Sequence, residues 1–247
     1  MKPKPCYSIW IFIFFLLIVN TTYSQSTSPD NQLIEELNND VKIKYGSNQA
    51  MVNGILYESK YNRDLGHPFI DKEEFTLESI VIQDELYDQT KLMYNIYDQS
   101  VVILYDNAKG EQIRYVPSNK YISLFTLNNR VFKKMNIGGF QDIFFQEIYS
   151  GENVSCVYYW YKQREESYHQ RTFVTFQYLD PKTKRYLIIQ NELLKYNSKY
   201  KFVKLFPSRL RSDISAYIKT NKIKLKKSSD SQVNELVNYC DKLLNQQ

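Results

Sequence analysis

The sequence has few of the residues that disulfide frameworks and histidine chemistry require. It contains 3 cysteines and 2 histidines in 247 residues. Only Cys156 and Cys240 lie beyond the first 24 residues, so we expect a hydrophobic core, and not disulfides, to hold the fold. The net charge is also small, +5 for the whole chain. A charge of this size does not by itself indicate a nucleic-acid partner, and we expect none.

Spacings that bind metals or activate a nucleophile are also missing. There is no H-x-x-x-H, C-x-x-C, calcium-loop or G-x-S-x-G pattern, so we expect no metal and no cofactor and can assign no catalytic residue. The acidic run at 71–74 is interrupted by a lysine and predicts a solvated connection. His67 lies in a Gly-His-Pro turn and His169 in an expected strand. Cys156 could form a dyad with His169, but its alternation with apolar neighbours indicates a core thiol.

One uncharged apolar run is present, at residues 9–19. It follows two lysines and precedes a small-residue motif that ends at Ser24, an order typical of a secretory signal peptide. The run is shorter than the about 20 residues of a membrane-spanning helix, which argues against the alternative of an uncleaved anchor. We expect cleavage after Ser24, with residues 1–24 removed and residues 25–247 forming one periplasmic or secreted domain without a transmembrane segment.

Residues 91–116 are the architectural centre of the chain and predict three consecutive antiparallel strands. Leu92, Tyr94 and Ile96 alternate with less apolar neighbours, the period of a strand with two unlike faces. The polar residues 97–100 provide the first reversal of the chain. Residues 106–110, which end in a glycine, provide the second.

Further strands are expected on both sides of this meander. Segment 154–163 is expected to pair with 168–178, with the charged residues 164–167 as a solvated connection, and Asn128-Asn129 should turn a hairpin. The expected strands are 55–57, 77–83, 121–127, 130–135, 142–149, 154–163, 168–178 and 185–190. Short strands separated by turn residues are typical of an antiparallel sandwich or an open, strongly bent barrel.

Helical spacing is confined to the two ends. Residues 28–41 predict a short N-terminal helix. Pro207-Ser208 opens a second helix, and Ser229 with Gln232 has capping-box spacing before a third, whose inner face would include Val233 and Cys240. The expected fold class is α+β, mainly antiparallel β, with a short N-terminal helix and two C-terminal helices.

Four short segments occur together in a familiar order. They are Val-Asn-Gly-Ile-Leu-Tyr at 52–57, Gly-His-Pro-Phe at 66–69, the segment 79–102, and Tyr-Ile-Lys-Thr-Asn-Lys at 217–222. This combination resembles a family of uncharacterised exported proteins of Bacteroidota. The resemblance implies a periplasmic or secreted location in a Gram-negative cell envelope, and it brings no activity and no catalytic residues.

Two features are candidates for binding. Alternation places Tyr159 and Tyr161 on the strand face opposite to Tyr158 and Trp160, where they could contact a partner; an aromatic ladder that supports the sheet is the simpler explanation. Residues 199–227 contain ten Lys or Arg and one acid, and could attract an anionic surface, although such runs usually cover solvated helix faces. Cys156 and Cys240 could form a disulfide or remain two buried thiols.

These features favour an exported envelope protein that binds an unknown partner or belongs to an assembly, and is not an enzyme. The alternative is a periplasmic hydrolase acting on an envelope glycan or ester. A deep pocket with two close carboxylates, or a hydrogen bond from His67 to both a serine and an aspartate, would favour that alternative.

Overall fold

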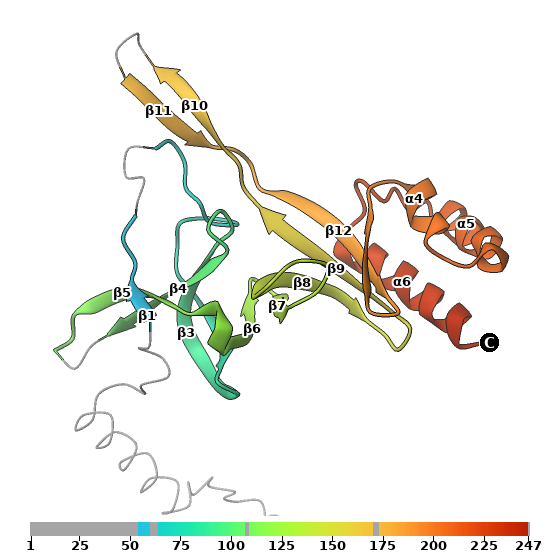
Figure 1. Cartoon of the computed structure of the whole chain (residues 1–247), viewed down its shortest axis with the longest axis horizontal. Helices are drawn as coiled ribbons and strands as arrows, with labels where there is room; N and C mark the ends of the chain where they lie inside the picture. Colours follow the sequence, from blue (N-terminus) through green and yellow to red (C-terminus); the bar gives the residue numbers. More distant parts are fainter. Residues whose placement is uncertain (1–53, 60–63, 107–108, 170–172, 247) are drawn as a thin grey trace, which may run out of the picture. The chain divides into compact units, whose positions relative to one another are not determined.

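The computed structural model describes residues 54–59, 64–106, 109–169 and 173–246, all within one compact unit that spans residues 46–247 (Figure 1). The side chains at 167–169 and 173–175 are excluded from the description. The expected signal peptide at 1–24 and the expected helix at 28–41 lie outside the described residues.

The described part of the chain is mostly antiparallel sheet. Its strands are β1 (Gly54–Leu56), β2 (Thr76–Ile82), β3 (Glu85–Asn95), β4 (Ser100–Asp106), β5 (Gln112–Pro117), β6 (Ile122–Leu127), β7 (Arg130–Met135), β8 (Ile143–Ser150), β9 (Val154–Tyr161), β10 (Arg164–His169), β11 (Phe173–Tyr178), β12 (Lys182–Ile189) and β13 (Glu192–Tyr196). A 3-10 turn, η1 (Asn119–Tyr121), precedes β6.

Eleven of these strands form a single sheet in the order β1-β5-β4-β3-β2-β6-β7-β8-β9-β12-β13. The predicted central meander is confirmed, because β3, β4 and β5 are antiparallel neighbours. The sheet is not closed, and helices instead of a second large sheet cover one of its faces near β8 and β9 (Figure 1). The mainly antiparallel class is therefore confirmed.

Tight two-residue turns connect several strands. Asn128 and Asn129 have φ of 49° and 62°, the left-handed pair that joins twisted strands, so the predicted hairpin of β6 and β7 is confirmed. Gln190 and Asn191 make the same turn between β12 and β13. Glutamine is not a strong signal for such a turn, and the sequence did not predict β13.

The prediction for residues 164–178 is wrong in two respects. The charged residues at 164–167 belong to strand β10, which pairs with β11 in a two-stranded sheet, and β9 pairs with β8 and β12. Arg164 explains how a charged segment becomes a strand: its guanidinium donates to both carboxylate oxygens of Asp64, at 2.5 and 3.1 Å, and lies 3.8 Å from the centre of the Phe176 ring.

The C-terminal region is helical, as predicted. After the unpredicted short helix α4 (Lys199–Lys204), the two expected helices are present as η2 (Ser208–Leu210) continuing into α5 (Arg211–Thr220), and as α6 (Asp230–Asn245). The predicted capping box is confirmed in both directions, between Ser229 and Gln232. Val233 and Cys240 of α6 are fully buried, as the spacing predicted.

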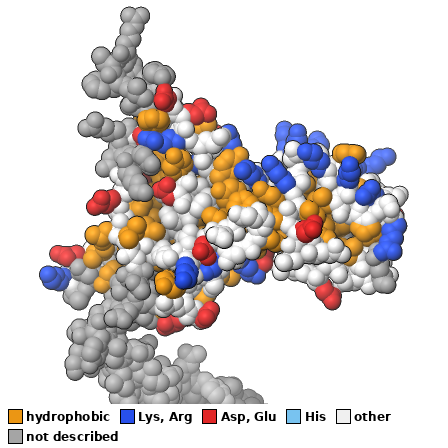
Figure 2. Space-filling view, viewed as in Figure 1, with side chains coloured by type: hydrophobic (Ala, Val, Ile, Leu, Met, Phe, Trp, Pro, Cys, Tyr) orange, Lys and Arg blue, Asp and Glu red, His pale blue; other side chains and the backbone are white. Residues whose placement is uncertain are grey.

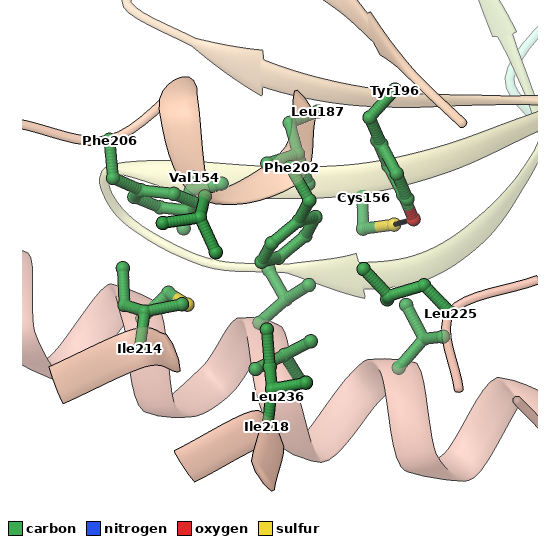
Figure 3. Packing of buried hydrophobic residues seen from close by; sticks show 14 of the residues in the cluster. Val154, Cys156, Leu187, Tyr196, Phe202, Phe206, Ile214, Ile218, Leu225 and Leu236 are labelled. Carbon is green, nitrogen blue, oxygen red and sulfur yellow. Dashed lines mark hydrogen bonds between the residues drawn. The ribbon is translucent and has the colours of Figure 1, made fainter. Parts of the chain in front are cut away.

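We call the sheet face that contacts the helices the inner face and the opposite one the outer face. On the inner face, one apolar cluster joins β8, β9 and β12 to the three helices through residues such as Phe202, Ile218 and Leu236 (Figure 3). A second cluster, which includes Tyr94 and Phe125, is formed mainly by residues of strands β2 to β8. Trp160 packs against both clusters.

Buried amides tie this tryptophan to both sides of the core. The Trp160 indole N–H donates to Gln146 Oε1 at 2.7 Å, and Gln146 Nε2 donates to Asp230 Oδ2, at the start of α6, at 2.7 Å. The Trp160 carbonyl accepts from Gln99 Nε2 at 2.9 Å. Tyr94 donates to the oxygen of the same Gln99 side chain at 2.8 Å. A polar chain therefore crosses the boundary between the two apolar clusters.

The end of α6 is fixed to the β8–β9 turn by one carboxylate. Asp241 is 5% exposed and accepts from the backbone N–H groups of Asn153 at 2.9 Å, of Glu152 and Val154 at 3.2 Å, and from the Tyr149 hydroxyl at 3.0 Å. Gly151 lies so close to this carboxylate that a Cβ there would collide with it. The turn and the helix therefore constrain each other.

Replacing Gln146 by Leu tests the polar chain. The variant leaves the Trp160 N–H and the Asp230 carboxylate without their buried partner, so the free energy of unfolding should fall by about 1–3 kcal/mol. Urea unfolding measures this loss. Gln112→Leu, at an exposed position of β5, is the matched control and should be near neutral; equal effects from both variants would contradict the assignment.

Asp241 predicts a pH-dependent contribution to stability. Burial opposes ionisation of this carboxyl, but the hydrogen bonds from Asn153, Tyr149 and Glu152 outweigh it and lower its pKa below the ordinary value of 3.8. Because the folded state favours the ionised carboxylate, Asp241 stabilises the fold at pH values above 3.8. This stabilisation is lost as the pH falls through the lowered pKa of Asp241 in the folded state. Asp241→Asn should therefore cost about 1–3 kcal/mol near pH 7.

The difference in the free energy of unfolding between wild type and Asp241→Asn should become smaller below pH 3.8. Urea unfolding across the acid range measures it. Asp106→Asn, at an exposed position of β4, is the control. A difference in the free energy of unfolding that stays constant with pH would show that ionisation of Asp241 does not contribute to stability.

Candidate functional site

Tyr159 and Tyr161 lie on the outer face of β9, as alternation predicted. Their neighbours Tyr158 and Trp160 point to the inner face and pack with the helices. The two outer rings are nearly parallel, with 5.9 Å between centroids and an angle of 11°. Lys184 of β12 lies beside both, with its Nζ 5.6 Å from the Tyr159 ring centre and 5.0 Å from that of Tyr161.

The two tyrosines differ in what surrounds them. The Tyr159 ring contacts Phe140 at 5.2 Å and Phe145 at 5.8 Å, within a small apolar cluster on the outer face. Burial and the neighbouring phenols of Tyr186 and Tyr161 raise the pKa of Tyr159. Tyr161 stands at the end of β9, outside this cluster. Both side chains are half-buried, but Tyr159 belongs to the outer-face cluster, whereas Tyr161 lies outside it and stacks on the Tyr159 ring.

A row of side chains crosses the outer face from β3 to β12. Strand register places Leu86 beside Val81, Val81 beside Leu124, and Leu124 beside Lys133. The row continues through Phe145 and Tyr159 to Lys184. Leu86 is 58% exposed, while Val81 and Leu124 are half-buried. No helix in the described part of the chain belongs to this face.

Hydrophobic side chains also gather over β9 and β12 in the space-filling view (Figure 2). The loop at 136–142 covers part of the outer face there, because Phe140 packs on Phe145 and Tyr186. Gly138, with φ of 60°, lies against the Leu193 side chain and leaves no room for a Cβ. The loop at 136–142 therefore packs closely on the outer face of the sheet, through Phe140 and Gly138.

The structure does not support the thiol dyad. Cys156 is fully buried, and its thiol lies 3.4 Å from the Tyr196 hydroxyl (Figure 3). Burial raises the pKa of Cys156 to about 12 and that of Cys240 to about 12. Both cysteines are free thiols within the same inner cluster. The side chain of His169 lies outside the described part.

His67 is surrounded by groups other than those of a catalytic triad. Lys162 Nζ donates to the His67 carbonyl at 2.7 Å and lies 3.4 Å from its Nδ1. Burial, followed by the nearby Lys162 charge, lowers the pKa of His67. Burial also lowers the pKa of Lys162. This contact ties the 64–70 segment to the residue that follows β9.

The acidic run lines a cavity of about 220 Å³ whose floor includes Tyr94 and Met93. Asp71 pairs with Arg130 and accepts from Asn128 at 2.8 Å, and Glu74 lies 4.0 Å from Lys72. Both carboxylates are exposed, as predicted for a solvated connection. Among the described residues, no group of three or more His, Cys, Asp or Glu could hold a metal ion.

Comparison of the chain with protein-family models, with curated proteins and with solved structures found no match. Among the helices that the structure describes, none is both long enough and apolar enough to span a membrane. The site must therefore be interpreted from its own geometry.

The thiol environments predict very low reactivity in the native protein. With pKa values of about 12, Cys156 and Cys240 should hold almost no thiolate near pH 8 and should resist iodoacetamide. Both should react after unfolding in guanidinium, as measured by peptide mapping of each cysteine. Rapid native labelling of Cys156, or a peptide in which the two are bridged, would contradict this description.

Proposed function

We propose that the chain is an exported, non-enzymatic component of the cell envelope that binds a protein partner or belongs to an assembly. The proposed contact is the outer face of the sheet around Tyr161. The observation that carries this proposal is the stacked pair Tyr159 and Tyr161 on a sheet face to which no helix of the described part belongs. Exposed Leu86 and half-buried Val81 and Leu124 lie on the same face, separated from the pair by Lys133 and its ion pair with Glu147.

The division between the two faces supports this assignment. The inner face buries its apolar residues beneath α4, α5 and α6, so its composition is explained by folding. The outer-face residues Leu86, Val81 and Leu124 have no such explanation. Apolar side chains that folding leaves uncovered on a sheet face are available for contact with another molecule.

The chemistry around Tyr161 indicates what the partner must offer. Tyr161 is flanked on β12 by Lys182, its register partner, and by Lys184. A tyrosine provides a flat apolar area with a polar tip, and the lysines favour a carboxylate nearby. The expected partner surface is therefore apolar or aromatic, with an acidic residue at its rim.

Tyr161→Ala should separate binding from folding. Because the ring lies outside the outer-face cluster, the change should alter stability by no more than about 0.5 kcal/mol. If the ring is a contact hot spot, retention of the partner should fall roughly thirtyfold, the equivalent of about 2 kcal/mol. The measurement is quantitative mass spectrometry of proteins that co-purify with the tagged chain from its native envelope, combined with thermal unfolding.

Two variants provide controls. Tyr121→Ala removes another exposed tyrosine, 40% exposed at η1, and should leave retention unchanged. Tyr159→Ala should lower the melting temperature, because its ring packs on Phe140 and Phe145. The proposal fails if every co-purifying protein is retained equally by wild type and the Tyr161 variant.

A further inference from the structure

The segment 199–227 forms a basic surface that is separate from the outer face of the sheet. Nine of its ten Lys and Arg side chains are exposed, and Arg211 is half-buried. Lys and Arg gather over α4 and α5 in Figure 2. We call this the basic layer; its cations are Lys199, Lys201, Lys204, Arg209, Arg211, Lys219, Lys222, Lys224, Lys226 and Lys227.

The core of the protein holds these charges in place. Apolar residues that alternate with the cations are buried against the inner face of the sheet: Phe202, Val203, Phe206, Leu210, Ile214, Ile218, Ile223 and Leu225. The helices therefore cannot turn their basic side inward. The basic layer therefore stays on the surface of the folded protein, because the apolar sides of the same segment pack in the inner cluster.

The lysines of the layer are not paired with acids within the described part of the chain. None of its eight lysines forms an ion pair there, and Asp213 is the only acid in the segment. Like charges held this close repel one another, and a polyanion relieves that repulsion. Electrostatic complementarity thus favours an anionic partner for the layer.

An exposed aromatic residue within the layer indicates which polyanion. Tyr200 is 73% exposed, stands between Lys199 and Lys201, and has the Lys204 Nζ 5.9 Å from its ring centre. Tyrosine with an apolar body and a polar tip is favoured at the headgroup level of bilayers, where flanking lysines meet lipid phosphates. We propose that the basic layer binds the surface of a bilayer that contains anionic phospholipid, with Tyr200 entering the headgroup region.

This contact would be peripheral and sensitive to salt. Each basic residue near an anionic bilayer improves partitioning by roughly fivefold, and the attraction decays within about 10 Å at 0.1 M salt. Several lysines acting together are therefore needed. The proposal does not depend on the outer-face partner, because the two surfaces share no residue.

Co-sedimentation of the full chain with vesicles tests the proposal. Vesicles of phosphatidylcholine with phosphatidylglycerol should bind the chain, whereas vesicles of phosphatidylcholine alone should not. Raising the salt from about 0.1 M to about 1 M should release it. The triple variant Lys199→Glu, Lys201→Glu, Lys204→Glu should bind at least roughly a hundredfold less tightly. Tyr200→Ala should weaken binding without changing its salt dependence.

The control changes the same net charge elsewhere. Lys72→Glu, Lys120→Glu and Lys195→Glu alter three exposed lysines outside the layer and should leave binding within a few-fold of wild type. Circular dichroism verifies that both triple variants are folded. The proposal is overturned if both triples lose binding equally, if neutral vesicles bind as well, or if dextran sulfate binds the chain while anionic vesicles do not.

Discussion

Trp160 is the residue on which the arrangement of both faces depends. Its indole packs against the two apolar clusters of the inner face, and its N–H and carbonyl are both hydrogen-bonded to buried amides. Because successive strand residues point to opposite faces, fixing Trp160 inward fixes Tyr159 and Tyr161 outward. The same contacts extend through Gln146 to Asp230, so the helical layer and the central meander are joined at this point.

As a result, neighbouring residues of β9 contact different faces of the sheet. Tyr158 and Trp160 pack in the core, whereas Tyr161 lies on the outer face, outside the apolar cluster that includes Tyr159. Tyr159 is intermediate, because it supports the Phe140 loop on one side and borders the open surface on the other. Of the residues considered for hydrolase chemistry, the Cys156 thiol lies against the Tyr196 hydroxyl, His67 contacts Lys162, and Asp71 pairs with Arg130.

Local signals in the sequence predicted much of the fold. Alternation around Leu92 and Tyr94 predicted the meander, and the residues Asn128-Asn129 predicted a turn that needs two positive φ angles. The sequence also predicted the capping box at Ser229 and the buried face of α6. What could not be predicted depends on distant partners: β10 needs Asp64 to pair with Arg164, and the fixed end of α6 needs the backbone of the β8–β9 turn around Asp241. The face on which Tyr159 and Tyr161 lie was predictable, but their different packing was not, because Phe140 reaches Tyr159 from a loop.

We propose that the outer face around Tyr161 contacts a partner in the cell envelope. Photo-crosslinking tests it most directly, with a photoreactive phenylalanine analogue placed at position 161 in the producing cells and, for comparison, at position 121. We expect one discrete crosslinked product from position 161 that is absent from position 121, identified by mass spectrometry. No product from position 161, or identical products from both positions, would contradict it.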